Sequence, residues 1–207
     1  MAFHNVVPES INHDSIRCNQ MTKLPVTGVI LAGGRSSRMG GADKGLIKWH
    51  NQPLYQHVLQ RLQPQVTTVW ISANRNIEVY QQSGVPVIRD TMADFPGPLA
   101  GILAALQQVE TDWVVFTSCD TPCLPENMAQ HLWLYRGKAR AVWARTGERD
   151  HPTQVLLHRS LADSLQQYLM QGDRKLMLFL QQAGGHSVLF AQGEPAFRNF
   201  NYPEDLL

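Results

Sequence analysis

Short apolar runs alternate with amphipathic segments along most of the chain. Runs rich in β-branched and aromatic residues predict strands at residues 26–32, 68–72, 85–88, 113–117 and 139–144. Apolar residues at helical spacing predict helices at residues 53–62, 77–82, 98–109 and 125–135. Strands that alternate with helices are typical of βαβ units, in which a mainly parallel sheet is covered by helices on both faces. We therefore predict one Rossmann-like α/β domain.

One cap is predicted in the regular part of the chain, and the pattern becomes less regular after residue 145. Asn51 precedes the first predicted helix and is a candidate N-cap. The Gly-Glu-Arg-Asp-His-Pro stretch at residues 147–152 predicts a loop. Strands are then expected near residues 154–157 and 187–190, with two helices between residues 160 and 182.

The first 24 residues differ from the rest of the chain. They are polar and lack the basic start and apolar core of a secretory signal. We expect a disordered extension at residues 1–24, with the domain spanning residues 25–207. Met21 lies just before the first predicted strand and offers an alternative start.

Composition and charge exclude several classes of protein. The 207 residues carry a formal net charge of +1, whereas a protein that binds duplex nucleic acid is usually far more basic. The apolar runs are too short to cross a bilayer. The three cysteines (Cys18, Cys119 and Cys123) are odd in number and irregularly spaced, which is typical of reduced thiols. We expect a cytoplasmic protein that binds neither nucleic acid nor membrane.

The first predicted strand is followed by a glycine-rich basic loop. Residues 31–45, LAGGRSSRMGGADKG, contain five glycines, two arginines and a lysine. Glycine allows backbone N–H groups to approach phosphate oxygens, and Arg35, Arg38 and Lys44 add positive charge. The loop lacks the Gly-Lys-Ser/Thr ending of a Walker A motif and the spacing of dinucleotide folds. We interpret it as a phosphate-binding loop, the alternative being a surface loop with solvated arginines.

An aspartate follows the most apolar predicted strand. Asp120 lies just beyond residues 113–117, in the sequence Ser-Cys-Asp-Thr-Pro. In open parallel sheets, ligands bind beyond the carboxyl ends of the strands, so this carboxylate should face the phosphate loop. Mg²⁺ would remove the repulsion between the carboxylate and phosphate, because this ion is commonly held by one or two carboxylates plus substrate phosphates. The alternative is a turn or cap aspartate.

Other polar residues follow strands with weaker signals. Asp90 could accept hydrogen bonds from a base or ribose, and Asn74 offers a donor and an acceptor together. Gly101, in the first turn of a predicted helix, would allow a flat ring to approach the backbone. His151 lies beside a proline in the predicted loop at residues 147–152, where a histidine is more often structural than catalytic.

Together these features suit nucleotidyl transfer. Such a reaction requires positioned phosphates and cations where charge develops, and little covalent participation by the protein. A phosphate acceptor is largely ionised near neutral pH, because its second pKa is about 6, so no general base is required.

With these motifs in order, the sequence resembles the molybdenum cofactor guanylyltransferases, which join GMP from GTP to molybdopterin. The resemblance runs from about Thr27 to Leu206. It rests on LAGGRSSRMGGADKGL, SANR, IRDTMADFPGPLAGIL, CDTPCLP, GERDHPT and NFNYPEDLL. It implies a nucleotidyltransferase fold with a nucleotide half at about residues 25–120 and an acceptor half at about residues 121–207.

The resemblance also implies the substrates and partners. The implied substrates are GTP and molybdenum-molybdopterin, the implied cofactor is Mg²⁺, and pyrophosphate is released as the second product. Proteins that insert or transfer the cofactor and apo-molybdoenzymes are further candidate partners. We expect a monomer.

The resemblance assigns roles to individual residues. It implies catalytic roles for Lys44, Asp120 and Arg38, with Asp120 also binding Mg²⁺. Some relatives have Asn where this chain has Ser72, which leaves a nucleotide contact there in question. The Asn199-x-Asn201 segment and His151 match the pterin side. The implied binding residues are Leu31, Ala32, Gly33, Gly34, Lys44, Asn74, Asp90, Asp120 and His151.

Three alternatives remain open. A sister enzyme would transfer CMP, or would use a sugar phosphate acceptor, although relatives that use CTP tend to begin the loop Leu-Ala-Ala-Gly. A carrier of the pterin cofactor would not require Lys44 and Asp120 together at a phosphate loop. A GTP switch protein would carry the Walker lysine, which this chain lacks.

Overall fold

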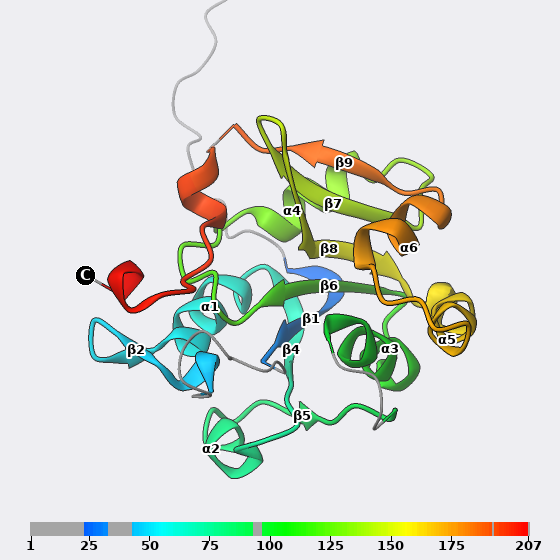
Figure 1. The fold of residues 1–207 in the computed structure, drawn as a ribbon. Helices are drawn as coiled ribbons and strands as arrows, with labels where there is room; N and C mark the ends of the chain where they lie inside the picture. The colour runs from blue at the N-terminus through cyan, green and yellow to red at the C-terminus, as the bar shows by residue number, and fades with distance from the viewer. Residues whose placement is uncertain (1–22, 33–42, 93–96, 192, 207) are drawn as a thin grey trace, which may run out of the picture.

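The computed structural model describes residues 23–32, 43–92, 97–191 and 193–206. Its centre is a seven-stranded sheet in the order β5-β4-β1-β6-β8-β7-β9 (Figure 1). The strands are β1 (Leu24–Leu31), β4 (Val66–Ser72), β5 (Val87–Ile88), β6 (Trp113–Ser118), β7 (Ala141–Thr146), β8 (Arg149–His158) and β9 (His186–Leu189). A hairpin of β2 (Lys48–Trp49) and β3 (Gln52–Pro53) forms a second, small sheet.

The sheet is mainly parallel, which confirms the predicted fold class. β1 pairs in parallel with both β4 and β6, and β4 pairs in parallel with β5. β8 alone runs against its neighbours: it is antiparallel to β6 and β7, while β7 and β9 are parallel to each other. The carboxyl ends of the other six strands therefore point to one edge of the sheet.

Helices cover both faces of the sheet (Figure 1). On one face, α1 (Leu54–Leu62) and α4 (Met128–Tyr135) contribute buried apolar residues to one core cluster. On the other face, α3 (Pro98–Gln108), α5 (Ala162–Met170) and α6 (Leu176–Gln182) contribute to a second cluster. The short α2 (Ile77–Gln81) lies beside β5. The 3-10 helices are η2 (Lys44–Leu46), η3 (Arg159–Leu161), η4 (Glu194–Phe197) and η5 (Pro203–Leu206).

Strand β1 shows why the central strands have almost uninterrupted apolar sequences. Val26 and Ile30 belong to the core cluster of α1, and Val29 and Leu31 belong to that of α3. A strand that is buried on both faces has no polar face to alternate with, as is typical of parallel sheets. Gly28 allows α1 to pack closely, since a Cβ atom there would lie 2.8 Å from a methyl carbon of Leu62.

Two segments, residues 147–152 and the turn that contains Asn51, differ from the predictions. The stretch at residues 147–152 is not a loop: β8 begins at Arg149, and the turn from β7 contains Gly147 with φ +51°. Hydrogen bonds to β7 stabilise this polar start of β8, although its sequence lacks apolar alternation. Asn51 is not the cap of α1 either. It lies in the β2–β3 turn with φ +62°, and Pro53 occupies the N-cap position.

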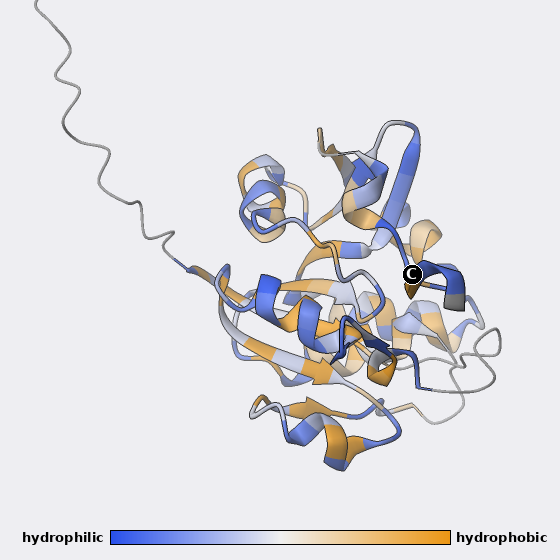
Figure 2. Ribbon diagram, turned by 90° about the vertical axis from the view of Figure 1, so that its left-hand side faces the viewer, coloured by the Kyte–Doolittle hydropathy of each residue, from blue (hydrophilic) through white to orange (hydrophobic). Residues whose placement is uncertain are grey.

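Most helices have the character of surface helices, and α3, whose residues 99–106 are all buried, is the exception. Figure 2 shows hydrophilic and hydrophobic residues together on the same helices, as expected for helices that pack one side on a sheet. In the part of the chain that the structure describes, no helix is both long and apolar enough to cross a membrane.

Candidate functional site

The carboxyl ends of the three central parallel strands lie in register. Leu31, at the end of β1, is opposite Ser72 in β4 and Ser118 in β6. The segments that follow these strands therefore emerge side by side at one edge, where ligands bind in open α/β sheets. Three predicted site residues, Gly33, Gly34 and Arg38, lie outside the described residues.

Lys44 connects the turn after β6 with a segment near the end of the chain. Its Nζ lies 2.7 Å from Oδ2 of Asp120 and 2.6 Å from Oδ1 of Asn201. The structure thus brings together Lys44 and Asp120, as the sequence predicted. It places Asp120 in the turn after β6 with only 7% of its surface exposed, so the carboxylate is more buried than a strand-end position suggests.

Neighbouring side chains orient the Asp120 carboxylate. Oδ1 accepts a hydrogen bond from Ser118 Oγ at 2.5 Å, and the Asp120 carbonyl accepts one from Phe200 N at 2.8 Å. Ser118 Oγ lies 3.0 Å from Thr121 Oγ1, which in turn accepts from the buried Gln154 Nε2 at 3.0 Å. Ser118 and Gln154 were not among the predicted site residues. Gln154 adjoins the apolar run of β8, which was the signal that could have identified it.

The donor set at Asp120 fits Mg²⁺ held mainly by a substrate. Each carboxylate oxygen offers two lone pairs, and the hydrogen bonds from Ser118 and Lys44 use one on each. Among the described residues, no group of three or more His, Cys, Asp or Glu could hold a metal ion. One carboxylate with phosphates and water is a common arrangement for Mg²⁺, in contrast to an all-protein metal cage.

Asn74 and Asp90 form a pair where β4 and β5 end. Asn74 Nδ2 donates to Asp90 Oδ2 at 2.7 Å, and Asp90 N donates to Asn74 Oδ1 at 3.0 Å. Burial raises the pKa of the Asp90 carboxyl, and the hydrogen bond from Asn74 opposes this shift. A Cβ atom on Gly101 would lie 2.5 Å from Ser72 Oγ and 3.3 Å from Asp90 Oδ1. The structure therefore brings together Asn74, Asp90 and Gly101, which were predicted, and Ser72, for which a contact was left open.

The backbone at the end of β1 is partly engaged within the sheet. Ala32 N donates to Ser72 O at 2.8 Å, and Leu31 O accepts from Cys119 N at 3.1 Å. A contact from Ala32 to a nucleotide would therefore use its carbonyl and not its N–H.

A cavity of about 380 Å³, called here the acceptor-side cavity because its lining belongs to residues 121–207, adjoins the Lys44–Asp120 pair. Asn201, which accepts a hydrogen bond from Lys44, forms part of its wall. The wall also carries two cations: Arg149 lies 3.3 Å from Glu194, and Arg198 pairs with Asp205. The lining residues are Arg149, Glu194, Pro195, Arg198, Asn199 and Asn201.

His151 lies behind this cavity, in strand β8 and not in the predicted loop. Its Nε2 is 2.7 Å from Thr146 Oγ1, and Thr146 donates to Glu194 Oε1 at 2.9 Å, so Nε2 carries the proton. The ring is buried and stacks on Phe197 at 4.9 Å. Burial lowers the pKa of His151, Glu194 and Asp150 oppose this shift, and Arg149 adds to it. A role of His151 toward the acceptor stays a prediction.

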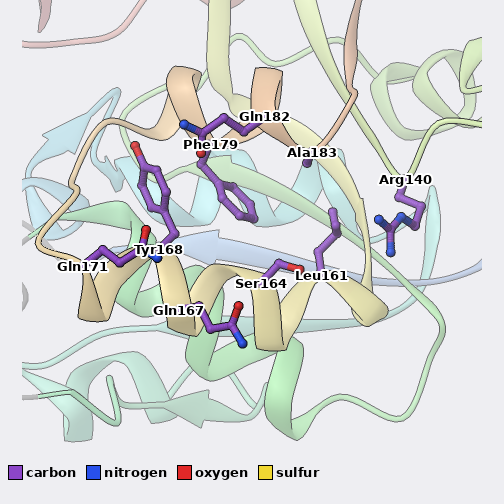
Figure 3. A pocket seen from close by; sticks show the side chains of 9 residues that line it. All are labelled: Arg140, Leu161, Ser164, Gln167, Tyr168, Gln171, Phe179, Gln182 and Ala183. Carbon is purple, nitrogen blue, oxygen red and sulfur yellow. The ribbon is translucent and has the colours of Figure 1, made fainter.

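A second cavity, of about 220 Å³, lies far from these residues. Figure 3 shows side chains of α5 and α6 around it, including Tyr168 and Phe179. Its wall also contains Arg140, whose carbonyl accepts from His158 N, and His158 is opposite Trp113 at the amino end of β6. This cavity is therefore at the opposite end of the strand from Asp120, and none of its lining residues was predicted as a site residue.

Comparisons with known proteins show what this chain is similar to. A family model described as MobA-like NTP transferase domain matches residues 28–188. A molybdenum cofactor guanylyltransferase of Serratia proteamaculans is 53% identical over 182 residues, 88% of this chain and 92% of the relative. One from Yersinia pseudotuberculosis is 51% identical over 180 residues, 87% of this chain and 92% of the relative.

The fold is also found among solved structures. The crystal structure of molybdopterin-guanine dinucleotide biosynthesis protein A from Archaeoglobus fulgidus superposes with a TM-score of 0.72 at 23% identity. The superposition covers 87% of this chain and 95% of that one. At this identity the likeness concerns the fold, and it confirms the predicted nucleotidyltransferase architecture.

Proposed function

Because the chain belongs to the family of MobA-like NTP transferase domains and is therefore a nucleotidyltransferase, we propose that it transfers GMP from GTP to molybdenum-molybdopterin. The acceptor is the terminal phosphate of the pterin, and the products are pyrophosphate and the guanine dinucleotide form of the cofactor. One observation carries the proposal: the Lys44–Asp120 pair lies beside the acceptor-side cavity, through the Lys44–Asn201 hydrogen bond.

GTP binds, in this proposal, across the carboxyl ends of β1, β4 and β6. Gly33, Gly34 and Arg38, beyond the described residues, would hold the triphosphate. The backbone of Leu31 and Ala32 would contact the nucleoside, with the Ala32 carbonyl as an acceptor, because Ala32 N already donates to Ser72 O. The Asn74–Asp90 pair would bind the nucleoside, because together these side chains offer an amide and a carboxylate. The missing Cβ of Gly101 leaves room for Ser72 Oγ and Asp90 Oδ1, so this glycine would allow the Asn74–Asp90 pair to lie close to the first turn of α3.

Lys44 and Asp120 carry the chemistry. The Lys44 ammonium would stabilise negative charge that develops on the phosphates during transfer. Asp120 would hold Mg²⁺, which supplies further charge stabilisation when bound. The acceptor phosphate is largely ionised near neutral pH, so the chain needs no general base to activate it.

The molybdopterin would occupy the cavity of about 380 Å³. Arg149 and Arg198 place positive charge in its wall, and Asn199 and Asn201 add amide donors and acceptors. His151 would support the cavity wall indirectly. It hydrogen-bonds to Thr146, and Thr146 donates to Glu194 in the wall.

A turnover assay tests this proposal. Purified protein is mixed with a molybdopterin-loaded acceptor, Mg²⁺ and either GTP or CTP, and both pyrophosphate and the dinucleotide product are measured. Product with GTP and little with CTP is the expected result. Product mainly with CTP would overturn the assignment of guanine. Bound pterin without product from either nucleotide would indicate a carrier.

A further inference from the structure

A buried carboxylate immediately precedes Lys44 in the chain and was not among the predicted site residues. Asp43 is the N-cap of η2, and its Oδ1 accepts a hydrogen bond from Gly45 N at 3.2 Å. Only 4% of its side chain is exposed, so it contacts solvent or substrate little. A charged carboxylate in such a position is unfavourable unless several donors surround it.

The donors that surround Asp43 come from a different part of the chain. Tyr80 OH donates to Oδ1 at 2.7 Å, and Asn76 Nδ2 donates to Oδ2 at 2.9 Å. Arg75 Nε lies 3.7 Å from Oδ2 and adds a positive charge. These three residues belong to the turn after β4 and to α2, which follow directly on the nucleoside-side residue Asn74. Asp43 therefore connects the phosphate side of the site with its nucleoside side.

The packing around this connection is tight. Asn76 adopts a left-handed conformation with φ +50°, which non-glycine residues rarely adopt, and its amide is held by Asp43. A Cβ atom on Gly45 would overlap with the Tyr80 hydroxyl, so only glycine fits there. Tyr80 is fully buried and packs edge-on against Tyr55 at 4.9 Å. The partners of Asp43 therefore have little freedom to move relative to η2.

We propose that Asp43 is a positioning residue for nucleotidyl transfer. Its carboxylate holds the backbone of η2 against the turn after β4, and thereby places the Lys44 ammonium at a defined distance from the nucleoside-binding pair. The carboxylate acts through Lys44 and does not itself contact the substrate or a metal ion. This inference rests on the proposed function, since Lys44 positions the phosphates that react.

A double-mutant cycle between Asp43→Asn and Lys44→Ala tests this inference. We expect Asp43→Asn to lower kcat/KM about tenfold when Lys44 is present, a size typical of directly coupled neighbours. In the Lys44→Ala background the same substitution should change kcat/KM less than about threefold, because the group that Asp43 positions is gone. A purely structural role would instead give effects that multiply.

Two further variants control for stability. Tyr80→Phe removes one donor and keeps the ring, so it should show a smaller loss with the same dependence on Lys44, even if Asp43→Asn folds poorly. Gln65→Leu lowers stability at a site that contacts residues 61, 125 and 129, and it should leave kcat/KM per folded molecule unchanged. Losses that are equal with and without Lys44, for both Asp43→Asn and Tyr80→Phe, would overturn the proposal.

The same cycle is measured on the Kd of Mg-GTP by calorimetry, which does not require turnover. Asp43→Asn should weaken binding severalfold only when Lys44 is present. If the natural chain binds Mg-GTP and forms no product, the proposed function fails, and the binding cycle still decides the role of Asp43. If the natural chain does not bind Mg-GTP, both proposals are overturned.

Discussion

Replacing Gly101 by alanine should damage the nucleoside side of the site without unfolding the domain. Gly101 lies in the first turn of α3, and alanine normally stabilises a helix interior by about 1 kcal/mol relative to glycine. Here the added methyl group would lie 2.5 Å from Ser72 Oγ, 3.3 Å from Asp90 Oδ1 and 3.4 Å from Leu31 Cδ2. The steric effect therefore opposes the effect of helix propensity.

The expected size follows from these distances. Ordinary contact begins at 3.4 Å, so Ser72 Oγ must retreat by roughly 0.9 Å. Inserting a methyl group into a packed site typically costs about 1–3 kcal/mol. Helix propensity offsets part of this cost to folding. The side chains that must move line the proposed nucleoside site, so we expect their displacement to weaken nucleotide binding as well. A loss of about 1.4 kcal/mol corresponds to a tenfold higher Kd for Mg-GTP.

Calorimetry with Mg-GTP, together with a thermal melt, separates the two effects. Gly101→Ala should bind about tenfold more weakly and melt within a few degrees of the natural chain. Adding Ser72→Ala removes the hydroxyl that clashes, so the double variant should recover most of the lost affinity. Ser72→Ala alone is the matched control. Unchanged affinity of Gly101→Ala, or no recovery in the double variant, would refute the steric reasoning.

Three other substitutions test separate parts of the structure. Asp120→Ala should nearly abolish turnover, because it removes the proposed metal ligand and the partner of Lys44; full activity with Mg²⁺ would exclude that role. Gln65→Leu should lower the free energy of unfolding by about 2–4 kcal/mol, since buried Gln65 accepts from Ala129 N and donates twice; denaturant titration measures this, and a change below 1 kcal/mol would contradict it. Burial lowers the pKa of His151 in the folded chain. As the pH falls below about 6.5, this histidine therefore takes up a proton in the unfolded chain before it does so in the folded chain. The natural chain should therefore lose more stability than His151→Gln between pH 7.5 and pH 5.5, and melting curves that shift equally in both would show that His151 does not cause the loss.

Much of the fold was predictable from local pattern. Buried parallel strands such as β1 and β6 are apolar on both faces, so their sequences are apolar runs of typical strand length. The helices between them show apolar residues at helical spacing. The direction of β8 was not predictable, and neither was its start at Arg149, because that polar stretch is stabilised by hydrogen bonds to β7 and not by its own burial pattern.

The candidate site was likewise predictable only in part. The sequence by itself determined the chemistry at the strand ends: Lys44 in a glycine-rich loop, and Asp90 and Asp120 just beyond strands. Residue type and distance from a strand end are local properties, and strand ends of a parallel sheet meet at one edge.

Only the tertiary structure decided which of these groups meet. Lys44 contacts Asn201, 157 residues away, and Asp43 accepts from Tyr80, 37 residues away. His151 was expected in a loop and lies buried in β8, where it contacts Thr146. Hydrogen bonds of this kind depend on distances of a few ångströms between distant segments. Local periodicity carries no information about such distances, which are set by how the helices and strands pack.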